Sequence, residues 1–193
     1  TTSEQIELLE RRGMLIGDKK HAEDMLLSIG YYRLGFYWYP FEELPPFGER
    51  THNFGRNTTW EKVEALYNFD DEFRSLLSMY IQVIETDIRT YLTYTVSNKY
   101  KIDPTWFANS KYVSQTFVDS LPTIYEDTIQ NEVIKAHHNK YHNDKYAPAW
   151  KTIEFFTFGN VLALYRSIKD VNVRRNIFMR YGINAEKTFL SYA

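Results

Sequence analysis

The sequence predicts an all-α protein, a helical bundle of about seven to nine helices built around one long central helix. Three observations support this class. Apolar residues recur at three- and four-residue spacing over long stretches, and Ser, Thr and Asp stand where helix N-caps are expected. No stretch of useful length alternates apolar and polar residues as strands do.

The composition fits one folded domain that is rich in aromatic residues. The chain of 193 residues has 16 Tyr and 13 Phe against 8 Gly, and its formal net charge is −2. Without a global positive charge, any contact with nucleic acid must use a local patch. The absence of Cys excludes disulfides, thiolate metal sites and cysteine nucleophiles. Because no apolar run is long enough for a bilayer and no signal-peptide pattern occurs, we expect a cytoplasmic protein with no membrane contact.

Two short helices are expected to form an N-terminal hairpin in residues 1–30. Gly13 stands where the first helix ends, Asp18 can cap the second, and Gly30 closes it. Residues 31–193 would then form the main helical domain.

The main domain opens with an aromatic segment, residues 31–41. The segment is apolar on nearly all sides, which predicts a buried helix. Residues 42–59 contain Pro45-Pro46, Gly48 and Gly55 and are expected to form a loop with room for a short hairpin.

The long central helix is expected over residues 60–98. Thr58 or Thr59 can cap it, and its apolar positions keep helical spacing without a breaker. A second long helix is expected from Gln115 to His142, with Pro122 near its start. Another starts near Ala149 and places Trp150, Ile153, Phe158, Val161 and Tyr165 on one face, and two short helices follow before the chain ends.

Two charged residues stand on surfaces that are otherwise apolar. Glu154 shares a predicted helix face with Trp150 and Phe158, and Arg33 is the only charge between Tyr31 and Phe41. Because a buried charge must be paired, we expect both to have buried partners, with Arg33 pairing with Glu154 or Glu85 in the core.

Glu85 and Arg89 lie four residues apart, with the acid first, which favours a surface ion pair on the long helix. The alternative is that Arg89 or Arg33 faces a cleft and holds phosphate through its planar guanidinium.

The only histidine cluster is the segment that contains His137, His138 and His142. His138 and His142 have the spacing of metal ligands on one helix face, but the surrounding lysines favour a solvated basic surface over a metal site or contacts with RNA phosphates. No phosphate-binding glycine loop or serine elbow occurs, so we expect neither a cofactor nor a metal.

Three segments resemble the Abi-like family of bacterial abortive-infection proteins, of the AbiD and AbiF type. They are Ile29–Phe41, then Leu66–Asp70 leading into Ile84–Arg89, and Ala147–Gly159. The family is similar to the HEPN superfamily of helical domains, which often act as metal-independent ribonucleases. The resemblance therefore implies a HEPN-like core and an RNA-directed role in phage defence. It matches Tyr32, Arg33, Glu85, Arg89, Trp150 and Glu154 to recurring positions of the family.

The catalytic motif that this resemblance implies is an Arg followed after four to six residues by His. None of the five histidines has an Arg at that distance before it. We therefore expect the chain to stop short of the motif, so that metal-independent endoribonuclease activity would belong to the full-length protein. The alternative is a naturally short member of the family that lacks the motif and binds without cutting. The chemistry needs an imidazole to move a proton at the ribose 2′-hydroxyl and a guanidinium to hold the phosphate.

Three functions remain open at this point. The first is a toxin-like defence ribonuclease that acts as a homodimer. The second is a non-catalytic RNA-binding module, recognising a structured RNA or restrained by an RNA or protein antitoxin; its phosphate contacts would come from Lys135, His138, Lys140, Arg174, Arg175 and Arg180. The third is a phage-sensing module with an exposed ring cluster near Tyr37 to Phe47.

Overall fold

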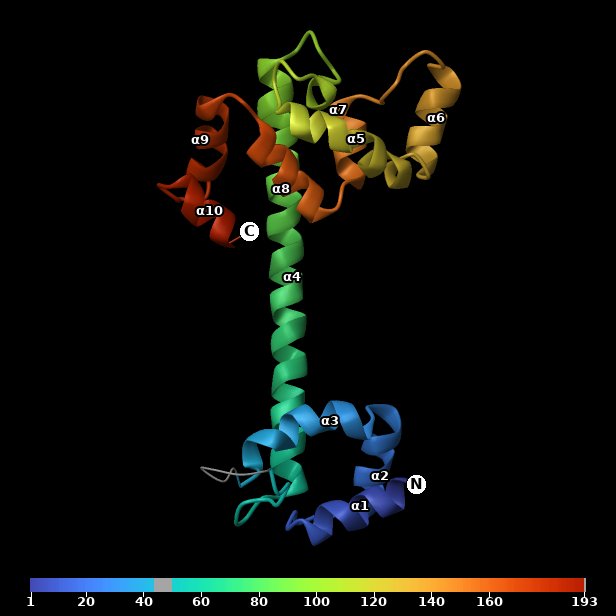
Figure 1. The fold of residues 1–193 in the computed structure, drawn as a ribbon, viewed down its shortest axis with the longest axis vertical. Helices are drawn as coiled ribbons and strands as arrows, with labels where there is room; N and C mark the ends of the chain where they lie inside the picture. Colours follow the sequence, from blue (N-terminus) through green and yellow to red (C-terminus); the bar gives the residue numbers. More distant parts are fainter. Residues whose placement is uncertain (44–49, 193) are drawn as a thin grey trace. The chain divides into compact units, whose positions relative to one another are not determined.

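The computed structural model describes residues 1–43 and 50–192 and is mainly helical (Figure 1). Among these residues there are ten α-helices and three 3₁₀ helices, and the only β structure consists of isolated bridges. The predicted all-α class is confirmed. The described residues include no helix that has both the length and the apolar character needed to cross a bilayer. The chain divides into two compact units, Thr1–Met79 and Tyr80–Ala193, and the domain boundary expected at residue 30 stays a prediction.

The first unit has a core formed by α1 (Thr2–Arg11), α2 (Lys19–Ser28), α3 (Tyr31–Trp38) and the start of α4 (Trp60–Lys99). Asp18 caps α2 as predicted, because its carboxylate accepts a hydrogen bond from the backbone N–H of His21 at 3.0 Å. The core side chains are Ile6, Leu9, Met14, Ala22, Met25, Leu26, Leu34, Trp38, Phe54, Trp60 and Val63. The N-terminal hairpin therefore shares one core with α3.

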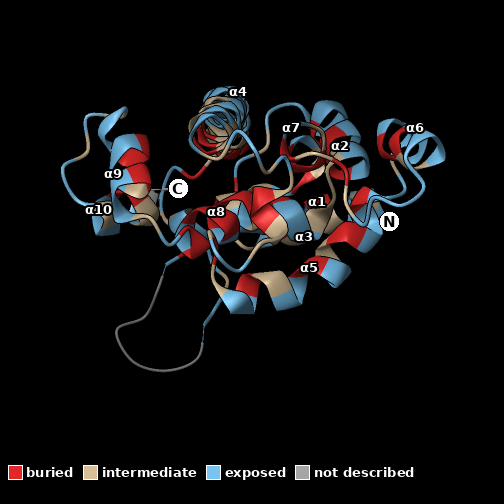
Figure 2. Ribbon diagram, turned by 90° about the horizontal axis from the view of Figure 1, so that it is seen from above, coloured by how far each residue is buried: buried red, intermediate tan, exposed pale blue. Residues whose placement is uncertain are grey.

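The prediction that the aromatic segment is buried on all sides is wrong. Leu34 and Trp38 lie four residues apart on α3 and are buried, whereas Tyr32 is 83% exposed and Phe36 is 65% exposed. The helix is amphipathic, with rings on both its buried and its exposed face. Figure 2 shows the same alternation of buried and exposed residues along most helices.

The segment after α3 begins with a 3₁₀ helix, η1 (Tyr39–Phe41). Residues 44–49, which include part of the predicted loop and the Phe47 end of the predicted ring cluster, lie outside the described residues. On either side of them, Glu42 and Phe54 form an antiparallel bridge, and the backbone N–H of Glu43 donates to the Asn53 carbonyl at 2.8 Å. The described residues on the two sides are therefore paired, and the short hairpin itself stays a prediction.

The long helix α4 is confirmed, and Thr59 is its cap. The Thr59 hydroxyl accepts a hydrogen bond from the backbone N–H of Lys62 at 3.4 Å. The apolar positions near the two ends of α4 are buried, namely Trp60, Val63, Ile88, Leu92 and Val96. Those between them are exposed, namely Phe73, Leu76, Leu77, Tyr80 and Ile84.

The second unit packs its helices around the C-terminal part of α4. Its elements are η2 (Trp106–Ala108), α5 (Gln115–Thr128), α6 (Glu132–Lys140), α7 (Ala149–Thr152), η3 (Ile153–Phe155), α8 (Phe158–Ser167), α9 (Val171–Met179) and α10 (Glu186–Tyr192). The largest buried side chains of this core are Trp106, Phe107 and Tyr165. Tyr165 lies against Phe189 of α10, with ring centroids 5.2 Å apart.

Two helices that the sequence presents as continuous are broken. The helix expected from Gln115 to His142 ends at Thr128, and Asn131 caps α6 by accepting from the backbone N–H of Val133 at 2.9 Å. The helix expected from Ala149 ends at Thr152. Thr157 then caps α8, accepting from the backbone N–H of Asn160 at 3.2 Å. In both cases the side chain of a good N-capping residue starts a new helix.

Candidate functional site

The Glu85–Arg89 ion pair is confirmed, and it is less exposed than predicted. Arg89 Nη2 donates to Glu85 Oε1 at 2.5 Å and to the Phe156 carbonyl oxygen at 3.1 Å. The Arg89 side chain is only 13% exposed, and its Nε is buried without a partner among the described residues. Arg89 thereby ties α4 to the turn before α8. These contacts favour a structural role over phosphate binding.

The predicted burial of Arg33 and Glu154 is wrong, because both side chains are exposed and neither forms an ion pair among the described residues of its own unit. Arg33 follows Tyr32 on the exposed side of α3. Glu154 lies in the 3₁₀ helix η3, where the turn after α7 buries Thr152 and Ile153 instead. The change from α to 3₁₀ geometry removes Glu154 from the face that it would share with Phe158 in a continuous helix.

Glu154 instead lies in an open groove within the second unit. The groove has a volume of about 470 Å³ and is lined by Glu154, Trp150 and Lys101 together with α4 residues such as Tyr94. Trp150 is 57% exposed and Tyr94 is 67% exposed. Among the described residues, no group of three His, Asp or Glu side chains could hold a metal ion, here or elsewhere.

The residues of α6 that were predicted to bind RNA have intramolecular contacts. His138 Nε2 lies 2.8 Å from the Tyr125 hydroxyl, and Lys135 pairs with Glu132 at 3.0 Å. Lys140 Nζ lies 5.3 Å from the ring centroid of its neighbour Tyr141.

The neighbouring His137 departs from the solvated surface predicted for the histidine cluster. It is buried, and its Nε2 lies 3.1 Å from Asp144 Oδ2. His137 and His138 therefore hold α6 against its neighbours instead of forming a free basic surface, whereas His142 is exposed.

The three arginines of the α9 region differ from one another. Arg174 binds Glu186 at 2.7 Å and also donates to the Ile168 carbonyl oxygen. Arg180 binds Asp87 through two hydrogen bonds, of 2.9 and 3.1 Å, and its guanidinium lies 4.4 Å from the centroid of the Tyr91 ring. Arg175 is exposed and has no ion partner among the described residues.

The pair of Arg180 with Asp87 shifts the pKa values of the groups around it. The hydrogen bonds from Arg180 and the Tyr181 hydroxyl hold the pKa of Asp87 below its ordinary value. The Tyr181 hydroxyl donates to Asp87 Oδ2 at 2.7 Å, and burial raises its own pKa. This network connects α4 to the end of α9.

Further cations gather where α8 passes into α9, and we call this cluster the basic junction: Lys99, Lys111, Lys169 and Arg174. Lys169 Nζ donates to the Ser110 carbonyl oxygen at 2.5 Å, and the Lys169 backbone N–H donates to the Tyr112 carbonyl oxygen at 2.8 Å. These bonds bring the segment that holds Lys111 against the segment that holds Lys169.

The other two members of the basic junction are Lys99, at the end of α4, and Arg174, in α9. Lys99 pairs with Asp170, and Arg174 donates to the Ile168 carbonyl oxygen. The hydrogen bond between Lys99 and Asp170 raises the pKa of Lys99 and lowers that of Asp170. Two of the four cations thus have a carboxylate partner, Asp170 for Lys99 and Glu186 for Arg174.

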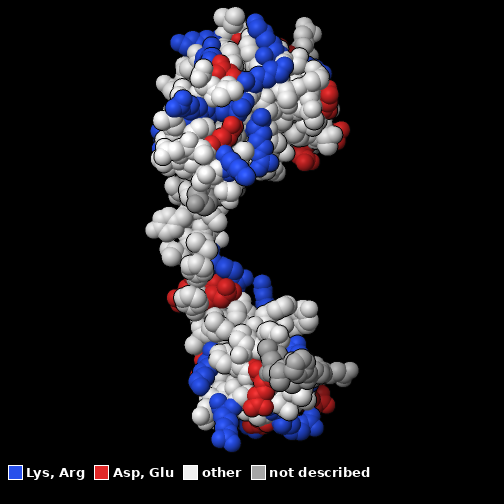
Figure 3. Space-filling model, turned by 60° about the vertical axis from the view of Figure 1, so that its left-hand side comes forward, with Lys and Arg blue, Asp and Glu red and all other residues white. Residues whose placement is uncertain are grey.

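Aromatic rings accompany the basic junction. The rings of Tyr100 and Tyr112 stack with centroids 4.0 Å apart, and Lys111 Nζ lies 5.5 Å from the Tyr112 centroid. In Figure 3, Lys and Arg side chains gather on the visible face of the Tyr80–Ala193 unit, with few acidic side chains between them. Lys and Arg outnumber Asp and Glu in this unit, and the reverse holds in Thr1–Met79. The charge of the whole chain conceals this difference.

The sequence reasoning missed Lys99, Lys111 and Lys169. A signal was present, because Lys99, Lys111, Lys140 and Lys145 each directly precede a tyrosine, and basic residues interleaved with aromatic ones are typical of nucleic-acid contacts. Only the folded chain shows which of these pairs come together.

The comparisons with known proteins agree with the three segments noted in the sequence. No curated protein and no solved structure matches the chain. A family model described as Abi-like protein matches residues 24–193, which include every element from α3 onward. The chain therefore belongs to the Abi-like family, and this membership indicates a role in abortive infection, a defence against phage.

Proposed function

We propose that this protein takes part in phage defence by binding RNA, and that the basic junction holds the RNA backbone. The observation that carries the proposal is that contacts among neighbouring segments bring Lys99, Lys111, Lys169 and Arg174 into one region, next to the stacked rings of Tyr100 and Tyr112. Clustered cations attract phosphates, and neighbouring aromatic rings provide surfaces on which unpaired bases stack. Lys111 and Lys169 carry most of the phosphate contact, because Lys99 and Arg174 already have carboxylate partners.

RNA binding through lysines has a measurable salt dependence. Each phosphate neutralised on a single strand contributes about −0.7 to the slope of log affinity against log salt concentration. The variant Lys111→Gln/Lys169→Gln should therefore have a slope smaller in magnitude by about 1.4 and weaker binding at low salt. Fluorescence anisotropy with a labelled single-stranded RNA measures both.

The matched control removes the same number of charges from α6, in the variant Lys135→Gln/Lys140→Gln. Its affinity and slope should equal those of the unchanged protein. If the α6 variant loses affinity and the junction variant does not, the interface lies on α6. If neither protein nor variant binds RNA at low salt, RNA is not the ligand.

The proposed function extends from RNA binding to RNA cleavage of the HEPN type. The reaction needs an imidazole and an adjacent guanidinium, and no histidine of this sequence follows an Arg at the required spacing. We assign RNA positioning to the basic junction, and we propose metal-independent cleavage for the full-length protein. Incubation of that protein with total bacterial RNA should give cleavage that EDTA leaves unchanged. Cleavage that EDTA abolishes, or none at all, would exclude this chemistry. The expected homodimer and antitoxin stay predictions.

A further inference from the structure

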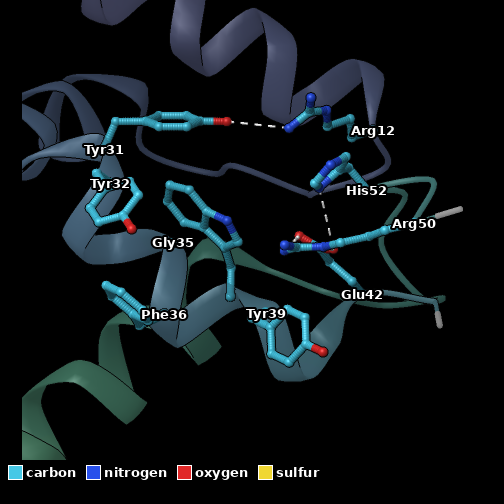
Figure 4. A pocket seen from close by; sticks show the side chains of 10 residues that line it. Arg12, Tyr31, Tyr32, Gly35, Phe36, Tyr39, Glu42, Arg50 and His52 are labelled. Atoms are coloured by element: carbon cyan, nitrogen blue, oxygen red, sulfur yellow. Dashed lines mark hydrogen bonds and ion pairs between the residues drawn. The ribbon is translucent and has the colours of Figure 1, made fainter.

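A pocket of about 580 Å³ lies entirely within the Thr1–Met79 unit (Figure 4). Its size is within the range of roughly 300–1,000 Å³ that is usual for small-molecule sites. The pocket is lined by α3 and η1, by Arg12 at the end of α1, and by Glu42, Arg50 and His52. The RNA proposal makes no use of these residues.

One end of the pocket is aromatic. Tyr32 and Phe36 lie edge to face, with centroids 5.4 Å apart and ring planes at 84°. They are 83% and 65% exposed, so together they offer a solvent-accessible apolar surface. A planar ligand ring can contact the face of one and the edge of the other. Figure 4 shows both rings on the opposite side of the pocket from the charged groups.

The other end is charged and held in place by a buried carboxylate. The Glu42 side chain is only 1% exposed, and Arg50 grips it through Nε at 2.6 Å and Nη2 at 2.7 Å. The Arg50 guanidinium also lies over the Tyr39 ring, 4.6 Å from its centroid. These contacts fix the plane of Arg50 and leave its Nη1 without an acceptor among the described residues.

Two further donors complete the charged end. Among the residues that the structure describes, the one acceptor of Arg12 Nη1 is the Tyr31 hydroxyl, at the long distance of 3.3 Å. His52 Nδ1 lies 3.6 Å from Glu42 Oε2, and the His52 backbone has φ 60°, in the left-handed region that non-glycine residues seldom adopt. Such residues concentrate at ligand sites. With Arg12 and Arg50 against one carboxylate, this end of the pocket is positive.

We propose that this pocket binds a nucleoside monophosphate group. The base lies against Tyr32 and Phe36, and the phosphate accepts hydrogen bonds from Arg12 and Arg50. A flat apolar ring joined to an anion satisfies both ends of the pocket, and guanidinium groups suit phosphate geometry. The group comes either from a free nucleotide or from the 5′-phosphorylated end of an RNA strand. Neither source requires the basic junction.

Isothermal titration of the full chain with AMP, adenosine and inorganic phosphate tests the pocket. AMP should bind at least tenfold more tightly than adenosine or phosphate, because each of these fills one end only. Tyr32→Ala and Arg12→Gln should each weaken AMP binding about tenfold. The matched controls are Tyr94→Ala, an exposed tyrosine of the other unit, and Arg33→Gln, an exposed α3 arginine outside the pocket, and both should bind as the unchanged chain does.

A competition experiment distinguishes the two sources. AMP is competed with a short RNA that has a 5′-phosphate and, separately, with the same RNA that has a 5′-hydroxyl. The protein is the Lys111→Gln/Lys169→Gln variant, so that RNA binding at the basic junction contributes little. If only the phosphorylated RNA displaces AMP, the strand end is the ligand; if neither RNA displaces it, the free nucleotide is. Failure of AMP to bind, or binding that both pocket variants leave unchanged, overturns the proposal. Either result leaves the RNA proposal standing, since that proposal is tested by RNA binding to the unchanged protein and to its junction and α6 variants.

Discussion

Replacing Arg89 by Met removes a cation that is mostly buried and keeps most of the aliphatic volume of the side chain. The change leaves Glu85 without its ion partner and the Phe156 carbonyl without its donor. Breaking a fully buried pair costs about 3–5 kcal/mol, and a surface pair contributes under about 1 kcal/mol. Glu85 is 29% exposed and Arg89 13% exposed, so the pair lies between these limits.

The free energy of unfolding should fall by about 2–3 kcal/mol. The fall is smaller than for a fully buried pair, because the substitution also removes the buried Arg89 Nε, which has no hydrogen-bond partner among the described residues. Urea denaturation followed by circular dichroism measures this free energy. Arg166→Met, at an exposed arginine with no ion partner among the described residues, is the control and should change stability by less than about 0.5 kcal/mol.

The double variant Glu85→Gln/Arg89→Met separates the pair from the rest of the change. It should lose less stability than the sum of the two single variants, since neither charge is then left alone. A loss for Arg89→Met as small as that for Arg166→Met would refute the reasoning that this guanidinium joins α4 to the turn before α8.

Three further predictions concern single positions. Arg180 lowers the folded-state pKa of Asp87, so the pair stabilises the protein above the unfolded pKa of about 3.9, and this stabilisation is lost as pH falls through the folded pKa. Asp87→Asn should therefore make the stability fall less steeply below about pH 4. The difference should be under about 1 kcal/mol, because both side chains are partly exposed to solvent. A steeper acid limb would contradict the sign. Gly30 has φ 96°, and an added Cβ would have no atom within 4 Å, so a substitution there meets backbone strain but no steric clash. Gly30→Ala should therefore lower stability by about 1–3 kcal/mol and lower the urea midpoint. An unchanged midpoint would mean that the turn adopts another conformation. Trp106 is fully buried, so Trp106→Ala should lower stability by about 3–5 kcal/mol. Trp150 is 57% exposed, so Trp150→Ala should lower it by under about 0.5 kcal/mol. Equal losses of stability in thermal melts would show that Trp150 is buried.

Local features of the fold could be predicted from the sequence. The caps at Asp18 and Thr59 and the length of α4 follow from residue type and spacing over neighbouring turns. The breaks before α6 and α8 could not be predicted with the same certainty. Asn131 and Thr157 are good caps, yet apolar periodicity continues across both, and only the packing of the second unit decides that a new helix starts there.

For the candidate sites too, contacts between neighbouring turns could be predicted and contacts between distant segments could not. Glu85 and Arg89 are one helical turn apart, so spacing alone predicts their pair. The burial of Arg33 was wrongly predicted because the segment carries rings on both faces of α3, and the pattern alone does not show that Leu34 and Trp38 are the buried positions. The basic junction joins residues far apart in the chain, as in the contact of Lys169 with Ser110, and no local pattern contains that information.

The most direct test of the RNA-binding account is ultraviolet crosslinking of the intact protein to RNA in cells challenged with phage, followed by mass spectrometry of the crosslinked peptides. The account predicts crosslinks at the basic junction, in the peptides that contain Tyr112 and Lys169, and their loss in the Lys111→Gln/Lys169→Gln variant. RNA crosslinked only to α6, or no crosslinked RNA in cells where the protein still blocks phage, would contradict it.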